Sequence, residues 1–237
     1  MSYFLSGEKL ILGREIVLKG PEALHILLSR RVKLGEILQL QDQGQKRFAC
    51  EVVSIVKKEL VVKVVKPLEI PLELSAAITL YQSMVSEKAL DFILQKTTEL
   101  GILNIFLFNS ERTATKMTLE QFAKKYERWE KILWESAKQC DRSVIPKLSF
   151  LPDLQKVLDQ TSEQSTVYIL DASGVRLESG KKDLKVSLAV GPEGGFTQNE
   201  LEQLKTIPNS KTVSISPFTL RAETAAIASL VIVQTMI

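Results

Sequence analysis

The segment that most constrains the fold is the stretch 191–196, Gly-Pro-Glu-Gly-Gly-Phe, which joins a predicted strand to a predicted helix. The apolar run 186–190 before it has the composition of a buried β-strand. After it, Thr197 and Glu200 have the spacing of a capping box, which marks the start of a helix. The glycine-rich turn is therefore held at both ends by regular structure.

A second stretch, 216–225, repeats this plan with the sequence Ser-Pro-Phe-Thr-Leu-Arg-Ala-Glu-Thr-Ala. A predicted strand at 212–215 precedes it, and an alanine-rich helix follows with Glu223 in its first turn, where the helix dipole favours an anion. Two such loops that leave adjacent parallel strands would face each other at the carboxyl edge of a sheet. Open α/β sheets bind ligands at that edge, so we predict a ligand site between the two stretches.

The remaining strands and helices divide the chain into two regions. Before residue 67 the pattern is of short β-branched runs joined by hairpins, with one helix, and it predicts a small barrel. Its expected elements are strands at 16–18, 36–40, 48–56 and 60–65 and a helix at 22–32. The segment 67–71 carries two prolines and breaks the pattern, so we place the domain boundary there.

After this boundary, predicted strands alternate with predicted helices. The expected elements include strands at 76–80, 105–108 and 167–170 and helices at 86–100 and 119–139. This alternation predicts a parallel sheet with helices on both faces, which is the α/β class. The domains are then 1–70 and 72–237.

Composition excludes several kinds of chemistry. The chain has a single histidine, His25, and two cysteines, Cys50 and Cys140, which match no zinc-ligand spacing, so we expect no metal site. One histidine also argues against Ser-His-Asp and Cys-His catalysis. Because no run approaches the roughly 18 apolar residues of a membrane span and no signal-peptide pattern is present, we expect a cytoplasmic protein without membrane contact.

Net charge is uneven along the chain. Residues 1–71 carry a net charge of +4, whereas the remaining residues sum to −1. A basic N-terminal region is a weak indication of an anionic partner there, such as a nucleic acid.

The two stretches do not match the common phosphate-binding loops, since 191–196 has neither the Walker nor the dinucleotide pattern. Paired glycines allow backbone to approach a flat ligand closely, but a simple tight turn explains them equally well. Arg221 at the start of the last helix can orient an anion or a carbonyl oxygen, or can pair with Glu223 on the surface. The polar segments 109–113 and 139–146 can line a site or form loop caps and surface ion pairs.

Taken together, these segments resemble a known family, the bacterial 16S ribosomal RNA uracil-N3 methyltransferases (RsmE) of the SPOUT superfamily. The resemblance covers nearly the whole chain. Its motifs are Gly-Pro-Glu-Gly-Gly at 191–195, Leu-Arg-Ala-Glu-Thr-Ala at 220–225, the run 95–101, Ser110-Glu111-Arg112, the set Gln139, Arg142 and Pro146, and the N-terminal His25, Arg31 and Gly35.

The resemblance implies a PUA-like RNA-binding domain at 1–70 and a SPOUT domain at 72–237 with a C-terminal trefoil knot. It also implies a homodimer that acts on 16S ribosomal RNA of the small ribosomal subunit with S-adenosyl-L-methionine as cofactor. The expected cofactor-binding residues are Leu170, Gly191, Pro192, Glu193, Gly194, Gly195, Ile215, Ser216, Phe218, Leu220 and Thr224. The expected RNA-binding residues are His25, Arg31, Lys88, Arg112 and Arg142.

The chain departs from the family pattern at three places: 215–218 replaces Leu-Gly-x-Arg, Ser86-Glu87 replaces a Lys-Gly pair, and Leu24 replaces a histidine. For catalysis we expect Arg221 to polarise a uracil carbonyl while Glu223 or Glu193 accepts the N3 proton or orients Arg221. Two other functions stay open. One is methylation of another RNA position, and the other is RNA binding without catalysis by the same fold.

Overall fold

The computed structural model describes residues 3–71, 74, 76–161, 165–177 and 185–236, and the chain forms two compact units. The first unit contains residues 1–73 together with 137–144, and the second contains 74–136 and 145–237. Residues 137–144, which we had assigned to the second domain, thus belong to the first unit. Local sequence patterns carry no information about this association between distant segments.

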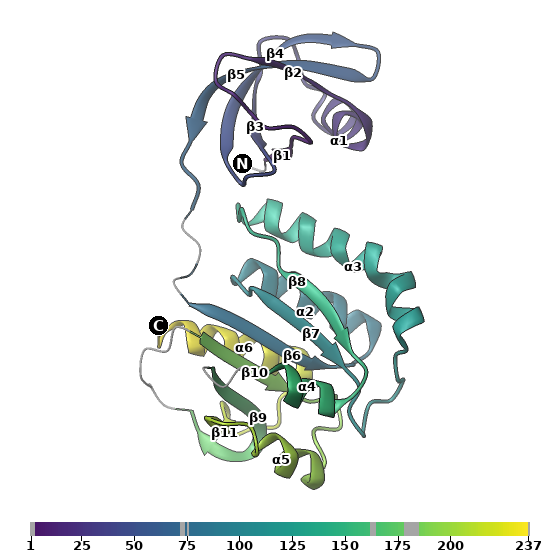
Figure 1. Ribbon diagram of the computed structural model, residues 1–237, viewed down its shortest axis with the longest axis vertical. Coiled ribbons are helices and arrows are strands. Elements are labelled where there is room, and N and C mark those ends of the chain that lie inside the picture. The colour runs from purple at the N-terminus through teal and green to yellow at the C-terminus, as the bar shows by residue number, and fades with distance from the viewer. Residues whose placement is uncertain (1–2, 72–73, 75, 162–164, 178–184, 237) are drawn as a thin grey trace. The chain divides into compact units, whose positions relative to one another are not determined.

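The first unit is built on a curled five-stranded sheet in the order β1-β3-β4-β5-β2 (Figure 1). Its elements are β1 (Phe4–Leu5), β2 (Glu15–Leu18), α1 (Gly20–His25), the π-helical turn η1 (Ile26–Arg30), β3 (Ile37–Gln41), β4 (Arg47–Val56) and β5 (Glu59–Leu68). The expected strands are present, and the expected helix is split into α1 and η1, which ends at Arg31 with φ of 50°. Sequence patterns missed β1, because two residues show no periodicity.

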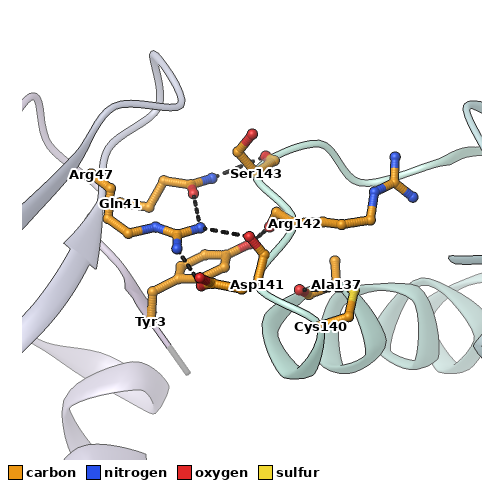
Figure 2. A network of polar contacts seen from close by, with 8 residues as sticks. All are labelled: Tyr3, Gln41, Arg47, Ala137, Cys140, Asp141, Arg142 and Ser143. Carbon is orange, nitrogen blue, oxygen red and sulfur yellow. Dashed lines mark hydrogen bonds and ion pairs between the residues drawn. The ribbon is translucent and has the colours of Figure 1, made fainter. Parts of the chain in front are cut away.

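Arg47 is the centre of a buried polar network that joins 137–144 to the sheet of the first unit (Figure 2). Its side chain is only 1% exposed and forms an ion pair with Asp141. The guanidinium also lies over the ring of Tyr3, with 4.1 Å between Cζ and the ring centroid. The pairing matters because an isolated buried charge costs several kcal/mol.

The same network fixes the backbone of 142–143 (Figure 2). The hydroxyl of Tyr3 donates to the Arg142 carbonyl at 2.7 Å, and Gln41 Nε2 donates to the Ser143 carbonyl at 3.0 Å. Burial raises the pKa of Tyr3 to about 12, so its hydroxyl keeps its proton and remains a donor at neutral pH.

The second unit is built on a six-stranded sheet in the order β11-β9-β10-β6-β7-β8, and all of its pairings are parallel (Figure 1). Its strands are β6 (Ala77–Ser83), β7 (Asn104–Phe108), β8 (Lys147–Leu151), β9 (Thr166–Arg176), β10 (Lys185–Val190) and β11 (Ser210–Ser214). Its helices are α2 (Glu87–Glu99), α3 (Leu119–Gln139), α4 (Leu154–Gln160), α5 (Gln198–Leu204) and α6 (Ala222–Gln234). The predicted α/β class with a parallel sheet is confirmed.

Helices cover both faces of this sheet, as the alternation predicted. On one face, α2, α3 and α6 pack on the strands through a core that includes Leu90, Trp129 and Leu230. On the other face, α4 and α5 pack through a second core that includes Val157 and Leu204. Period-2 alternation along each strand separates the two cores, since successive side chains point to opposite faces.

Within the described residues, no helix is long and apolar enough to cross a membrane. The same residues contain no group of three His, Cys, Asp or Glu side chains arranged to hold a metal ion.

Candidate functional site

A cleft of about 210 Å³ lies at the carboxyl ends of β10 and β11 and beside the middle of β9. Its walls are the first loop, defined as residues 191–196, and the second loop, defined as residues 215–221, together with the segment 170–172 within β9. We expected β10 and β11 to be adjacent, and this was wrong because β9 pairs with both of them. Three strands therefore contribute to the cleft, two with their carboxyl ends and β9 with its middle, so the site involves more than the two loops.

The first loop turns tightly and faces the cleft with backbone. Gly195 adopts φ of 69°, a left-handed conformation that glycine allows at little cost, and its N–H donates to the Pro192 carbonyl at 2.9 Å. A Cβ added at Gly191 would lie 3.2 Å from the Gly195 carbonyl carbon and from the Phe196 nitrogen. The left-handed turn thus favours glycine at 195, and the loop's own backbone leaves little room for a side chain at 191.

Charged side chains from elsewhere in the second unit contact the first loop. Arg112 Nη1 donates to the carbonyls of Gly194 and Phe196 at 2.9 and 3.3 Å. The Glu193 carboxylate accepts from the Ser86 N–H at 2.8 Å, at the start of α2. The loop is therefore tied to two neighbouring segments by charge-assisted hydrogen bonds, which are stronger than neutral ones.

The second loop is held mainly by its own residues. Ser214 Oγ donates to the Ser216 carbonyl at 2.9 Å, and the Phe218 N–H donates to Ser216 Oγ at 3.0 Å. Among the residues that the structure describes, the hydrogen bonds of 216–220 stay within 214–218. Phe218 lines the cleft but is 77% exposed to solvent.

A separate groove of about 760 Å³ runs between α2, α3 and the first turn of α6. Residues at the start of α6 are divided between the cleft and the groove. Leu220, Ala222 and Ala225 line the cleft, and Arg221, Glu223 and Thr224 line the groove. The α2 side supplies Lys88, the exposed ring of Phe92 and Gln95. The start of α6 therefore lines both the cleft and the groove.

The side chains of Arg221 and Glu223 differ in solvent exposure within the groove. Arg221 is the N-cap residue of α6, its side chain is 85% exposed, and its Nη1 lies 3.9 Å from Glu223 Oε1. Glu223 has a side chain only 20% exposed. At 3.9 Å the two groups form a loose ion pair, so Arg221 retains donors that can reach a ligand.

The predicted cofactor residues gather along the cleft, with Thr224 as the exception because it lines the groove. Residues that the sequence reasoning did not select also line the cleft, namely Asp171, Ala172, Val190, Val213, Ser214, Thr219, Ala222 and Ala225. Asp171 and Ala172 directly follow the strand predicted at 167–170, and this position could have indicated them from the sequence.

The predicted RNA-binding residues are dispersed. Lys88 lines the groove, and Arg112 donates to the first loop. His25 and Arg31 are exposed in the first unit. Arg142 belongs to that unit as well but is only 8% exposed, and its carbonyl accepts from Tyr3.

Comparison with known proteins identifies the family. The family model described as an RNA methyltransferase domain matches residues 72–234. A protein of Aquifex aeolicus named ribosomal RNA small subunit methyltransferase E is 33% identical over 232 residues, which are 96% of each chain. The chain belongs to this methyltransferase family. The Bacillus subtilis member with the same name is 30% identical to this methyltransferase and covers 89% of it, with 86% of its own length matched.

A solved relative of this methyltransferase adds the ligand. The crystal structure of ribosomal RNA small subunit methyltransferase E from Neisseria gonorrhoeae bound to S-adenosyl methionine has 27% sequence identity and a TM-score of 0.88. The match covers 100% of this chain and 98% of the other. The fold of this methyltransferase is therefore the fold of a relative that binds S-adenosylmethionine.

Proposed function

We propose that this chain methylates N3 of a specific uridine in 16S ribosomal RNA of the small ribosomal subunit, with S-adenosylmethionine bound in the cleft between the first and second loops. The observation that carries the proposal is the cleft at the ends of β10 and β11, beside β9, in a chain of the small-subunit methyltransferase E family. Its partners would be ribosomal RNA and a second copy of the chain, in the cytoplasm.

The residues of the cleft fit this cofactor. The lining consists largely of backbone and of apolar side chains such as Leu170, Ile215 and Leu220. A Cβ at position 191 would crowd the loop's own backbone at Gly195 and Phe196, so glycine there keeps the turn beside the cleft compact. When bound, S-adenosylmethionine supplies an electrophilic methyl group.

Arg221 and Glu223 would act on the RNA from the groove. Uracil N3 carries an imide proton and is normally paired, so the base must be unpaired or flipped out before it reacts. Arg221 would polarise a uracil carbonyl and stabilise the anion that forms when N3 loses its proton. Glu223, which is partly shielded beside Arg221, would accept that proton or orient Arg221.

The exposed ring of Phe92 and the cation of Lys88 suit the groove to a nucleotide. Aromatic side chains stack on bases, and this stacking contributes about 1 to 3 kcal/mol per base in single-stranded complexes. Lys88 would contact phosphate, as predicted from its position at the start of α2. With Arg221, the groove offers two cations and one aromatic surface in one place.

Several architectural features belong to this proposal. We expect the first unit to act as a PUA-like RNA-binding domain through His25 and Arg31, and the second to contain a trefoil knot. At the register shift between β9 and β11, a Cβ at Gly174 would lie 2.5 Å from the Val213 nitrogen, so this contact between the two strands requires a glycine. A homodimer is expected as well, and light scattering on the purified protein tests it.

The decisive experiment is methylation of small ribosomal subunits and of naked 16S RNA taken from cells that lack this protein. With labelled S-adenosylmethionine and mass mapping of RNA fragments, we expect one 3-methyluridine in the small-subunit RNA. A methyl group at another position would replace the assignment of N3. Absence of both methyl transfer and cofactor binding by calorimetry would favour a non-catalytic RNA-binding protein.

A further inference from the structure

The first loop accepts hydrogen bonds from three sequence-distant places within the second unit, two of them side chains and one a backbone N–H. Arg112 donates to two of its carbonyls, and Gln82 Nε2 donates to the Gly191 carbonyl at 3.4 Å. In addition, the side chain of Glu193 in the loop accepts from the Ser86 N–H. The conformation of the loop is thus specified by residues that lie far from it in the sequence.

Arg112 acts from a turn that is itself fixed. The buried hydroxyl of Ser83, at the end of β6, donates to Ser110 Oγ at 2.9 Å and lies 3.2 Å from Thr113 Oγ1. Thr113 Oγ1 also accepts from the Ser110 N–H at 3.0 Å. The Arg112 stem packs over Gly194, where an added Cβ would lie 3.5 Å from Arg112 Cβ and Cδ. A rigid turn therefore presents the guanidinium to the loop carbonyls.

The helix after the first loop is tied to the same turn. Glu200 is 2% exposed, and its carboxylate accepts from the Thr197 N–H at 2.9 Å, as the capping box predicted. Its other oxygen accepts from the Glu111 N–H at 2.8 Å, which the sequence pattern did not reveal. The turn at 110–113 thus contacts the loop through Arg112 and the start of α5 through Glu200.

Glu193 connects the other side of the loop to α2. Ser86 is the N-cap of α2, and its own side chain makes no capping hydrogen bond. The Glu193 carboxylate accepts from the Ser86 N–H instead, next to the positive end of the helix dipole. An acceptor oxygen suffices for this contact, and no proton has to move.

We infer that Arg112 and Glu193 are positioning residues of the cofactor cleft, which hold the first loop in its ligand-ready conformation before the ligand arrives. The inference rests on the proposed function for the identity of the ligand. It assigns Arg112 to the loop and not to RNA contact, and it removes Glu193 as the acceptor of the N3 proton. Both assignments differ from what the sequence motifs suggested.

The first test compares Arg112→Ala and Arg112→Lys with the control Lys116→Ala. Lys116 is an exposed cation in the connection between β7 and α3, which also carries Arg112. Calorimetry measures the affinity of the cleft for S-adenosylhomocysteine, and a filter assay measures the affinity for small-subunit RNA. Hydrogen exchange of the ligand-free protein measures how well residues 191–197 are ordered. We expect Arg112→Ala to raise the Kd for S-adenosylhomocysteine by about tenfold, the order expected for loss of a charge-assisted hydrogen bond. RNA affinity should change less than about twofold, and Arg112→Lys should recover most of the cofactor affinity.

Hydrogen exchange makes this test independent of the proposed function. Faster exchange at 191–197 in Arg112→Ala, with Lys116→Ala unchanged, supports the inference even if the wild-type protein binds no S-adenosylhomocysteine, a result that would remove only the proposed function. Unchanged exchange together with reduced RNA affinity would overturn it. If Arg112→Ala does not fold, the same two readouts on Arg112→Met decide, because methionine keeps an aliphatic stem beside Gly194 but has no donor for the loop carbonyls.

The second test separates positioning from proton transfer at Glu193. Glu193→Gln keeps an acceptor oxygen for the Ser86 N–H but cannot accept a proton, whereas Glu193→Ala loses both. We expect Glu193→Gln to keep kcat within about threefold and Glu193→Ala to raise KM for the cofactor by about tenfold at little change in kcat. A large fall in kcat for Glu193→Gln, with KM unchanged, would identify Glu193 as the proton acceptor and defeat the inference.

Discussion

The two loops that form the cleft are held in different ways. The first loop is tied to α2 and to the turn at 110–113 through Glu193 and Arg112. The second loop, among the described residues, is hydrogen-bonded mainly to itself and exposes Phe218 and Arg221. A wall that is fixed in advance loses little entropy when a ligand binds, whereas a self-supported wall can adjust to the ligand or to RNA. Under the proposed function, the first loop would provide cofactor affinity, and the second would couple the cofactor to the substrate.

The largest difference between the loops should appear with Arg221→Ala. The guanidinium is exposed at the end of the second loop, so its loss should leave folding and cofactor affinity nearly unchanged while methyl transfer slows by about 100- to 1,000-fold. Single-turnover methylation and calorimetry on the same preparation measure the two effects. A rate within about threefold of wild type would show that Arg221 takes no part in the chemistry.

Gly195→Val tests the preformed state of the first loop and should have an intermediate effect. A valine at φ of 69° is strained by about 1 to 2 kcal/mol, which corresponds to a loss of cofactor affinity of about tenfold. Gly194→Ala is the matched control, because an added Cβ there meets only ordinary contacts with Arg112 at 3.5 Å. Equal cofactor affinity in both variants would contradict the preformed loop.

Phe218→Ala should have the smallest effect on stability. Because the residue is 77% exposed, we expect the free energy of unfolding to change by less than about 0.5 kcal/mol, as for other surface substitutions. RNA affinity should fall by a few-fold if the ring contacts the substrate. Denaturant unfolding and the filter assay measure these quantities, and a loss of stability above about 1 kcal/mol would mean that the second loop depends on Phe218.

Much of the second unit was predictable because its signals are local. The amphipathic pattern placed α3 at 119–139, as observed, and the capping box at Thr197 and Glu200 located the start of α5. Pairing order is not local, and nothing in the strand sequences indicated that β9 would separate β10 from β11. The two stretches predicted to flank a ligand site line one cleft, and residues 170–172 of β9 line it as well; that this cleft binds a ligand stays a prediction.

The individual roles of charged residues were harder to predict than their locations. The motif Ser110-Glu111-Arg112 suggested RNA contact, yet the guanidinium donates to carbonyls of the first loop. The second contact of Glu200, to the Glu111 N–H, depends on a turn 89 residues away in the sequence. Sequence patterns identify which residues carry charge, and only the tertiary fold determines their partners.

The first unit combines two segments that are distant in the sequence, and this has a consequence for biosynthesis. Arg47 is buried in this unit, but its carboxylate partner Asp141 comes later in the sequence, after residues 74–136 of the second unit. At a translation rate of about 5 to 20 residues per second, Asp141 follows residue 73 by roughly 3 to 14 s. During that interval the nascent N-terminal segment has a cationic side chain without its acid. It should reach its final stability only after much of the second unit has been synthesised, and a fragment that stops at residue 73 should be correspondingly less stable.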